Sequence, residues 1–168
     1  MKGLITVVFL GIFLVVGYIV GGMNIDKKLG DLGNGADEEV IATNSVLDLS
    51  RQGLTQVPAY VFGRTDIEEL NLSDNKLKGA LPAEIRHLQN LKILVLSNNK
   101  FTGIPAEIGQ LKNLEILDLS NNVFTGLPYE LGNLSKLELL DLSGNKYSEA
   151  DLANIRKNLP SSTVIKTD

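Results

Sequence analysis

From Leu47 onwards the chain repeats an alternating pattern in which two leucines flank one variable residue. The pairs are Leu47/Leu49, Leu70/Leu72, Leu94/Leu96, Leu117/Leu119 and Leu140/Leu142, spaced 23, 24, 23 and 23 residues apart. Alternate side chains of a strand point to opposite faces, so each pair predicts a short strand whose leucines face a core. A fixed period of this length predicts a solenoid in which the strands stack into one parallel sheet.

A polar residue recurs at the end of each predicted strand. Asparagine follows the last four Leu-x-Leu pairs by three residues, at Asn75, Asn99, Asn122 and Asn145. The backbone must turn there, which leaves buried N–H and C=O groups without partners. Because a carboxamide both donates and accepts hydrogen bonds, we expect these residues to form a structural ladder between successive turns. Gln52 occupies this position in the first copy, which fits the atypical character of terminal repeats.

The return path of each repeat carries its own pattern. Pro105 and Pro128 follow a Thr-Gly pair and suit the first turn of a short helix. Ile108, Leu111 and Leu114 recur every three residues, so this segment is expected to pack back on the strand leucines. One extra residue before Pro82 predicts a local bulge in the outer loop that leaves the register of the sheet unchanged.

The full motif L-x-x-L-x-L-x-x-N-x-L, together with FTGIPAEIGQLKNL and FTGLPYELGNLSKL, resembles leucine-rich repeat proteins. Residues 44–160 are similar to the repeats of plant receptor ectodomains and of many small bacterial proteins. The resemblance implies an α/β fold: a curved solenoid with a short parallel sheet on its concave face and short helices and turns on its convex face. It also implies a role in protein recognition.

The pattern changes at the C-terminal end of the chain. Ser148, followed three residues later by Asp151, resembles a helix-capping pair. Leu152, Ile155 and Leu159 fall on one face of the predicted helix. We therefore expect this helix to cover the open end of the core, and Val164 and Ile165 to add a last extended segment.

The first residues differ in composition from the repeats. Leu4–Met23 is an apolar run of 20 residues, long enough as a helix to span one bilayer. We divide the chain into a membrane segment at 1–23, a Gly-rich flexible tether at 24–39, and a repeat domain at 40–168 with about five repeats and a helical cap.

The apolar run admits two interpretations. Its length exceeds that of a signal-peptide core and favours an uncleaved single-pass anchor through residues 4–23, although Val20-Gly21-Gly22 offers small residues to a peptidase. The short stub before it predicts that the repeats lie outside the cytoplasm. Cleavage would instead give a secreted protein.

Composition and motifs exclude several classes of function. The chain has no cysteine, and its net charge of −4 comes without a Lys/Arg block, which argues against thiolate metal sites and nucleic-acid partners. The single histidine, His87, is predicted at the surface, and no phosphate-binding loop is present. We predict neither enzymatic activity nor a metal or cofactor. An acid pair such as Asp118 and Asp141 lacks a cleft that would support catalysis.

The outward positions of the predicted sheet are the candidate binding residues. They are Glu69, Asn71, Ile93, Val95, Ile116, Asp118, Leu139 and Asp141. An apolar middle within acidic and serine-rich surroundings favours a protein or peptide ligand of basic character. The same residues also suit strands for purely structural reasons. The alternative function is a structural or adhesive cell-envelope protein that binds glycan or assembles with itself.

Overall fold

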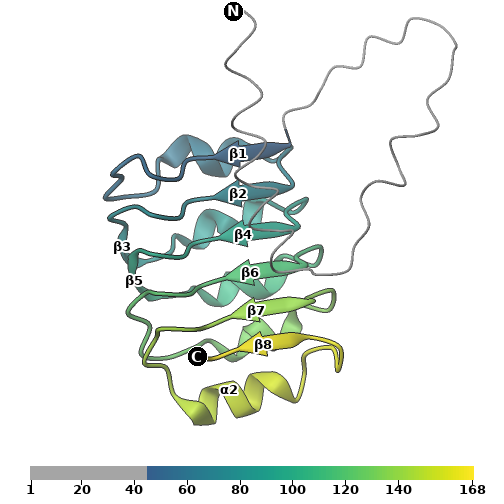
Figure 1. Ribbon diagram of the computed structural model, residues 1–168. Helices are drawn as coiled ribbons and strands as arrows, with labels where there is room; N and C mark the ends of the chain where they lie inside the picture. The colour runs from purple at the N-terminus through teal and green to yellow at the C-terminus, as the bar shows by residue number, and fades with distance from the viewer. Residues whose placement is uncertain (1–44) are drawn as a thin grey trace, which may run out of the picture. The chain divides into compact units, whose positions relative to one another are not determined.

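The computed structural model describes residues 45–168, in which the chain winds through stacked turns (Figure 1). Each turn contributes one three-residue strand to a six-stranded, entirely parallel sheet in the order β1-β2-β4-β6-β7-β8. The strands are β1 (Val46–Asp48), β2 (Glu69–Asn71), β4 (Ile93–Val95), β6 (Ile116–Asp118), β7 (Leu139–Asp141) and β8 (Val164–Lys166). The predicted parallel sheet is confirmed.

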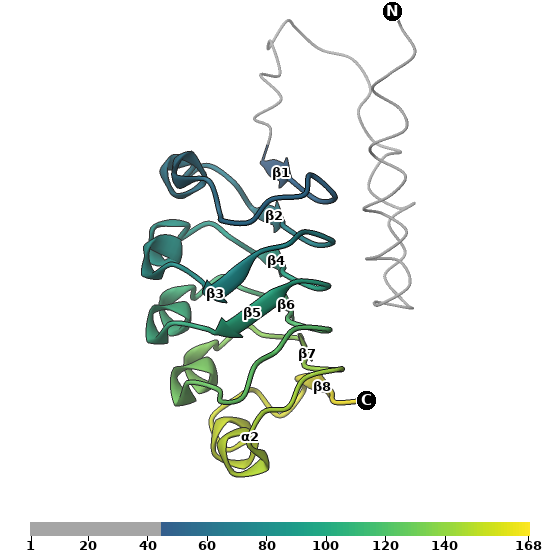
Figure 2. The same ribbon diagram turned by 90° about the vertical axis from the view of Figure 1, so that its left-hand side faces the viewer.

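Within residues 45–168, four short 3₁₀-helices return the chain along the side opposite the sheet (Figure 2). They are η2 (Ala59–Gly63), η3 (Ala83–His87), η4 (Ala106–Gln110) and η5 (Tyr129–Asn133), and each begins directly after a proline. Gly109 lets η4 approach η5 closely, because a Cβ atom at this position would lie 2.5 Å from the carbonyl oxygen of Glu130. The short helix predicted after each proline is confirmed in this tighter form.

A second, two-stranded sheet forms the flank between the main sheet and the helices (Figure 2). It pairs β3 (Lys78–Ala80) with β5 (Lys100–Gly103) in parallel. Its register shifts between Gly79 and Ala80, while β2 and β4 of the main sheet stay in register. The bulge expected from the extra residue in the second repeat is therefore confirmed.

The core is a continuous column of aliphatic side chains between the sheet and the helices. Leu94 in β4 and Leu96 directly after it are fully buried, and so are helix residues such as Ile85 and Ile108. Phe101 and Phe124 fill the space beside the flank. Each turn buries its apolar side chains only against its neighbours, so stability depends on stacking.

The C-terminal turn is sealed by α2 (Glu149–Arg156). The hydroxyl of Ser148 caps this helix by accepting a hydrogen bond from the backbone N–H of Asp151. Leu152, Ile155 and Leu159 are buried against the last repeat. Strand β8 then pairs with β7, so both the predicted cap and the predicted last extended segment are confirmed.

The expected membrane segment at residues 4–23 and the expected tether at residues 24–39 lie outside the described residues. No helix within residues 45–168 has the length and apolar character to cross a bilayer.

Candidate functional site

The register of the main sheet arranges the outward side chains in two rows, which together we call the sheet face. One row holds Val46, Glu69, Ile93, Ile116, Leu139 and Val164; the other holds Asp48, Asn71, Val95, Asp118, Asp141 and Lys166. All eight candidate binding residues therefore lie side by side. Val164 and Lys166 add one residue to each row. They were not among the candidates, because the sequence predicts the last extended segment but not its pairing with β7.

Exposure along the sheet face is uneven. Ile93 and Val95 are half-buried, as are Glu69, Asn71 and Asp141. Ile116 and Leu139 keep only 8% and 5% of their surface exposed, whereas Val164 keeps 57%. The apolar area open to a ligand therefore lies on β4 and β8 rather than on β6 and β7.

The polar residues of the second row also begin the turns that follow the strands. The side chains of Asp48, Asn71, Asp118 and Asp141 each accept a hydrogen bond from the backbone N–H two residues further on, over 2.9–3.0 Å. Asp118 is buried and its carboxylate accepts one of these hydrogen bonds, so it is less available to a ligand than the sequence suggested. Val95 carries no such group and is free of this turn function.

Serine contributes less to the surface than expected. Ser97 and Ser120 are buried. The hydroxyl of Ser143 donates a hydrogen bond to Asp141 over 2.6 Å. The prediction of hydroxyl-rich surroundings is therefore wrong at Ser97 and Ser120, because the chain turns inward there to begin its return path, whereas Ser143 is half-buried.

Some charged groups on the sheet face and directly before its strands pair with one another. The ammonium of Lys92 lies 2.8 Å from the carboxylate of Glu68, and that of Lys166 lies 3.8 Å from Asp141. Glu69 has no such close cation. Burial raises the pKa of its carboxyl above the ordinary value, and the neighbouring Glu68 raises this pKa further, against the opposing effect of Lys92. A cationic ligand next to Glu69 would therefore favour its ionised form.

Glu69→Gln is expected to raise the free energy of unfolding at pH 7 and to have little effect at pH 4. Because the folded pKa lies above the unfolded one, the contribution of Glu69 to stability is most favourable below the unfolded pKa and declines as the pH rises through the folded pKa. The variant removes that decline. The expected gain in the free energy of unfolding at pH 7 is less than about 1 kcal/mol, since Glu69 is only half-buried.

Urea unfolding of both proteins at the two pH values measures this difference. Glu138→Gln removes one negative charge from an exposed position next to β7 and is the matched control. An equal gain at pH 4 and pH 7 would contradict the assignment to Glu69.

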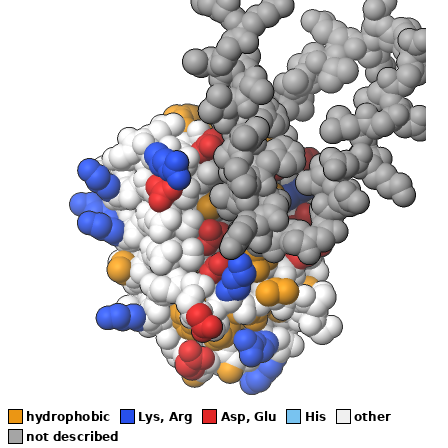
Figure 3. Space-filling model, viewed as in Figure 1, with side chains coloured by type: hydrophobic (Ala, Val, Ile, Leu, Met, Phe, Trp, Pro, Cys, Tyr) orange, Lys and Arg blue, Asp and Glu red, His pale blue; other side chains and the backbone are white. Residues whose placement is uncertain are grey.

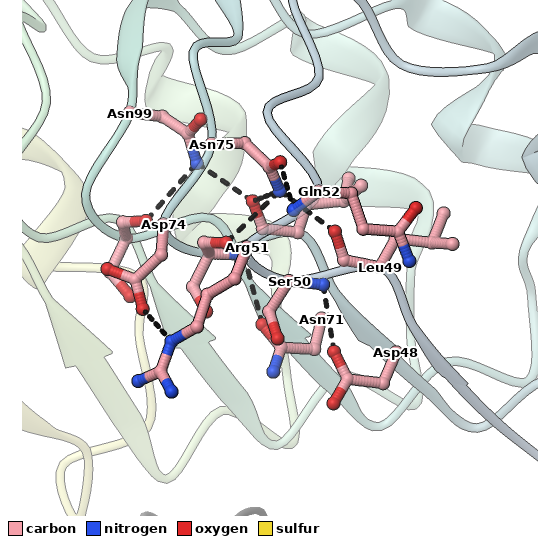
Figure 4. Close-up of polar contacts among 12 residues, drawn as sticks. Asp48, Leu49, Ser50, Arg51, Gln52, Asn71, Asp74, Asn75 and Asn99 are labelled. Carbon is pink, nitrogen blue, oxygen red and sulfur yellow. Dashed lines mark hydrogen bonds and ion pairs between the residues drawn. The ribbon is translucent and has the colours of Figure 1, made fainter.

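The four ladder asparagines bond to the backbone of their own turn and of the preceding one. Asn99 donates to the carbonyl oxygens of Leu72, Leu96 and Ser97 and accepts from the N–H of Leu77. Asn75, Asn122 and Asn145 make the equivalent contacts. Figure 4 shows the first step, where Asn75 contacts Leu49 and Gln52 and Arg51 pairs with Asp74. These side chains face the turns rather than a ligand.

The described residues contain no cluster of metal-ligating side chains. Within residues 45–168 no group of three or more His, Asp or Glu side chains is placed to hold a metal ion. His87 is exposed at the end of η3. What the geometry provides is a surface of parallel rows, which suits binding of an extended ligand.

Comparison with known proteins agrees with the fold. The family model described as "Leucine rich repeat" matches residues 45–101 and 89–146. The chain belongs to the leucine-rich repeat family. Receptor-like protein 9b of Arabidopsis thaliana is 39% identical over 59 residues, which are 34% of this chain and 6% of that protein.

Two solved structures from plants resemble the described turns. The ectodomain of the receptor kinase SOBIR1 from Arabidopsis thaliana has 31% identity and a TM-score of 0.58, over 72% of this chain and 67% of that one. The plant peptide hormone receptor RGFR1, in complex with RGF2, has 36% identity and a TM-score of 0.59, over 71% of this chain and 21% of that one. This chain thus spans a small part of the curated relative and of the hormone receptor.

Proposed function

We propose that this protein is a non-enzymatic, membrane-anchored interaction module that binds a protein or peptide through its sheet face. The observation that carries the proposal is the in-register patch formed by Glu69, Asn71, Ile93 and Val95 on β2 and β4. It combines accessible apolar surface with a carboxylate that has no close cation. Apolar contacts bordered by polar groups are typical of recognition surfaces.

The comparisons support this kind of partner. RGFR1 is described in complex with RGF2 as a plant peptide hormone receptor, and its repeats are 36% identical to those of this chain. SOBIR1 carries its repeats in the ectodomain of a receptor kinase. By analogy, the repeats of this chain are extracytoplasmic, with residues 4–23 as the anchor.

The charge of the patch favours a basic ligand. Glu69 is destabilised as a carboxylate, while Asp141 has Lys166 nearby and Asp118 is engaged with Ser120. A lysine or arginine of the ligand next to Glu69 would relieve this carboxylate, and an adjacent apolar residue would cover Ile93 and Val95. The proposed ligand is therefore an extended segment with an apolar residue beside a cationic one.

Selection of a displayed random-peptide library on the full chain tests the proposal. We expect enriched peptides to combine a basic and an apolar residue, and their affinity to fall about tenfold or more with Val95→Asn, because a buried valine contributes about 1.5–3 kcal/mol. Asn71 occupies the same row, so an asparagine fits the fold here. Val123→Asn, outside the sheet face, is the control. Equal binding to Val95→Asn, or no enrichment, contradicts the proposal.

A further inference from the structure

The lysines of residues 45–168 divide into two groups. Five have a partner: Lys92 with Glu68, Lys112 with the Asn133 carbonyl, Lys136 with Asn113, Lys157 with Asn154, and Lys166 with Asp141. The other four are Lys76, Lys78, Lys100 and Lys146. They are exposed, and their ammonium groups form no hydrogen bond or ion pair with another residue in 45–168. All four lie on one side of the solenoid, the flank that carries β3 and β5.

Backbone hydrogen bonds fix these lysines in a row along the solenoid. The N–H groups of Lys76, Lys100 and Lys146 donate to the carbonyls of Leu54, Leu77 and Phe124 in the preceding turns, over 2.8–3.1 Å. Val123 holds the equivalent place in the fourth turn and is 49% exposed. Lys78 pairs in register with Lys100. Figure 3 shows basic side chains along the edge where Figure 1 draws β3 and β5.

Carboxylates near this row lie at its two ends, with Glu149 and Asp151 at the start of α2 beyond Lys146. Asp74, at its first turn, is paired with Arg51 at 3.1 Å. Exposed hydroxyl groups of Thr102 and Thr125 lie beside the lysines instead. The flank therefore differs in sign from the sheet face, which holds Glu69, Asp118 and Asp141, and a ligand of one surface does not suit the other.

We propose that this flank binds a linear acidic polysaccharide, as a surface separate from the peptide-binding sheet face. Successive turns place cations about 4.8 Å apart along the axis, or about twice that across Val123, which suits repeated carboxylate or sulfate groups on an extended chain. Threonine hydroxyls bond sugar hydroxyls, and Val123 contacts the apolar edge of a sugar ring. The row exposes no aromatic ring for stacking on bases, which disfavours single-stranded nucleic acid.

Binding of the full chain, in non-ionic detergent, to fluorescent polygalacturonate, dextran sulfate and neutral dextran tests this inference. We expect binding to at least one acidic polymer and not to neutral dextran, with affinity that falls as salt rises. Lys76→Gln/Lys78→Gln/Lys100→Gln should weaken it about tenfold, the combined effect of three exposed ion pairs. Val123→Lys should strengthen it by completing the row.

The matched control is Lys112→Gln/Lys136→Gln/Lys157→Gln, which removes the same charge elsewhere and should retain affinity within about twofold. Binding to polygalacturonate would show that the flank recognises carboxylate groups. Binding to dextran sulfate alone would show that it recognises sulfate groups. An equal loss in the control triple variant, no response to Val123→Lys, binding to neither polymer, or equally tight binding to DNA overturns the inference. Val95→Asn should leave this binding unchanged, so failure here is distinct from failure of the peptide proposal.

Discussion

Asn122→Ala is expected to lower the free energy of unfolding by about 3–5 kcal/mol, since each buried polar group left unpaired costs about 1–3 kcal/mol. Asn122 is buried and accepts from the N–H of Phe101 over 2.9 Å. It donates to the carbonyl oxygens of Leu96, Leu119 and Ser120 over 3.0–3.1 Å. Alanine removes all four contacts and leaves their partners at a buried position.

Asn90→Ala is the matched control for this prediction. Asn90 is exposed and makes one hydrogen bond between turns, to the carbonyl of Thr65 over 2.9 Å. Water can replace that bond, so we expect a loss below about 1 kcal/mol. Chemical unfolding measures the loss in the free energy of unfolding for both variants. Similar losses would show that a buried ladder asparagine stabilises the fold no more than an exposed one.

Leu96→Ala is expected to destabilise the protein by about 2–5 kcal/mol, the usual range for a fully buried leucine. Leu96 is 0% exposed and directly follows β4, and Leu72 and Leu119 hold the equivalent positions after β2 and β6. Each repeat packs only on its neighbours, so a cavity in the middle of the column weakens the stacking on both sides.

Leu54→Ala provides the comparison at the first turn. Leu54 packs against the core but is only partly buried, so the variant forms less cavity and should lose less stability. A change for Leu96→Ala below the error of thermal or urea unfolding would contradict a stacked core.

Much of the fold follows from sequence periodicity. The Leu-x-Leu spacing predicts which residues pair, because a constant period leaves one register for buried leucines. The pairing of Ile93 with Ile116 and of Val95 with Asp118 follows from this spacing alone. The capping pair at Ser148 also predicts where α2 begins.

Other features depend on contacts that periodicity does not contain. Lys166 joins the sheet face only because α2 carries the chain back beside β7, and no repeat motif marks that return. The burial of Ser97 and Ser120 depends on the path of each turn. The row of lysines on the flank lies outside the main sheet, in β3, β5 and the neighbouring turns, so a search for the outward positions of the main sheet passes over it.

The most direct test of the interaction module is methyl NMR of the full chain, titrated with a peptide from the library selection. We predict that methyl signals of Ile93 and Val95 shift in a saturable way, while those of Val123 on the flank and Val61 in η2 stay in place. Saturable shifts at Val123 or Val61 with none at Ile93 and Val95 would contradict binding at the sheet face.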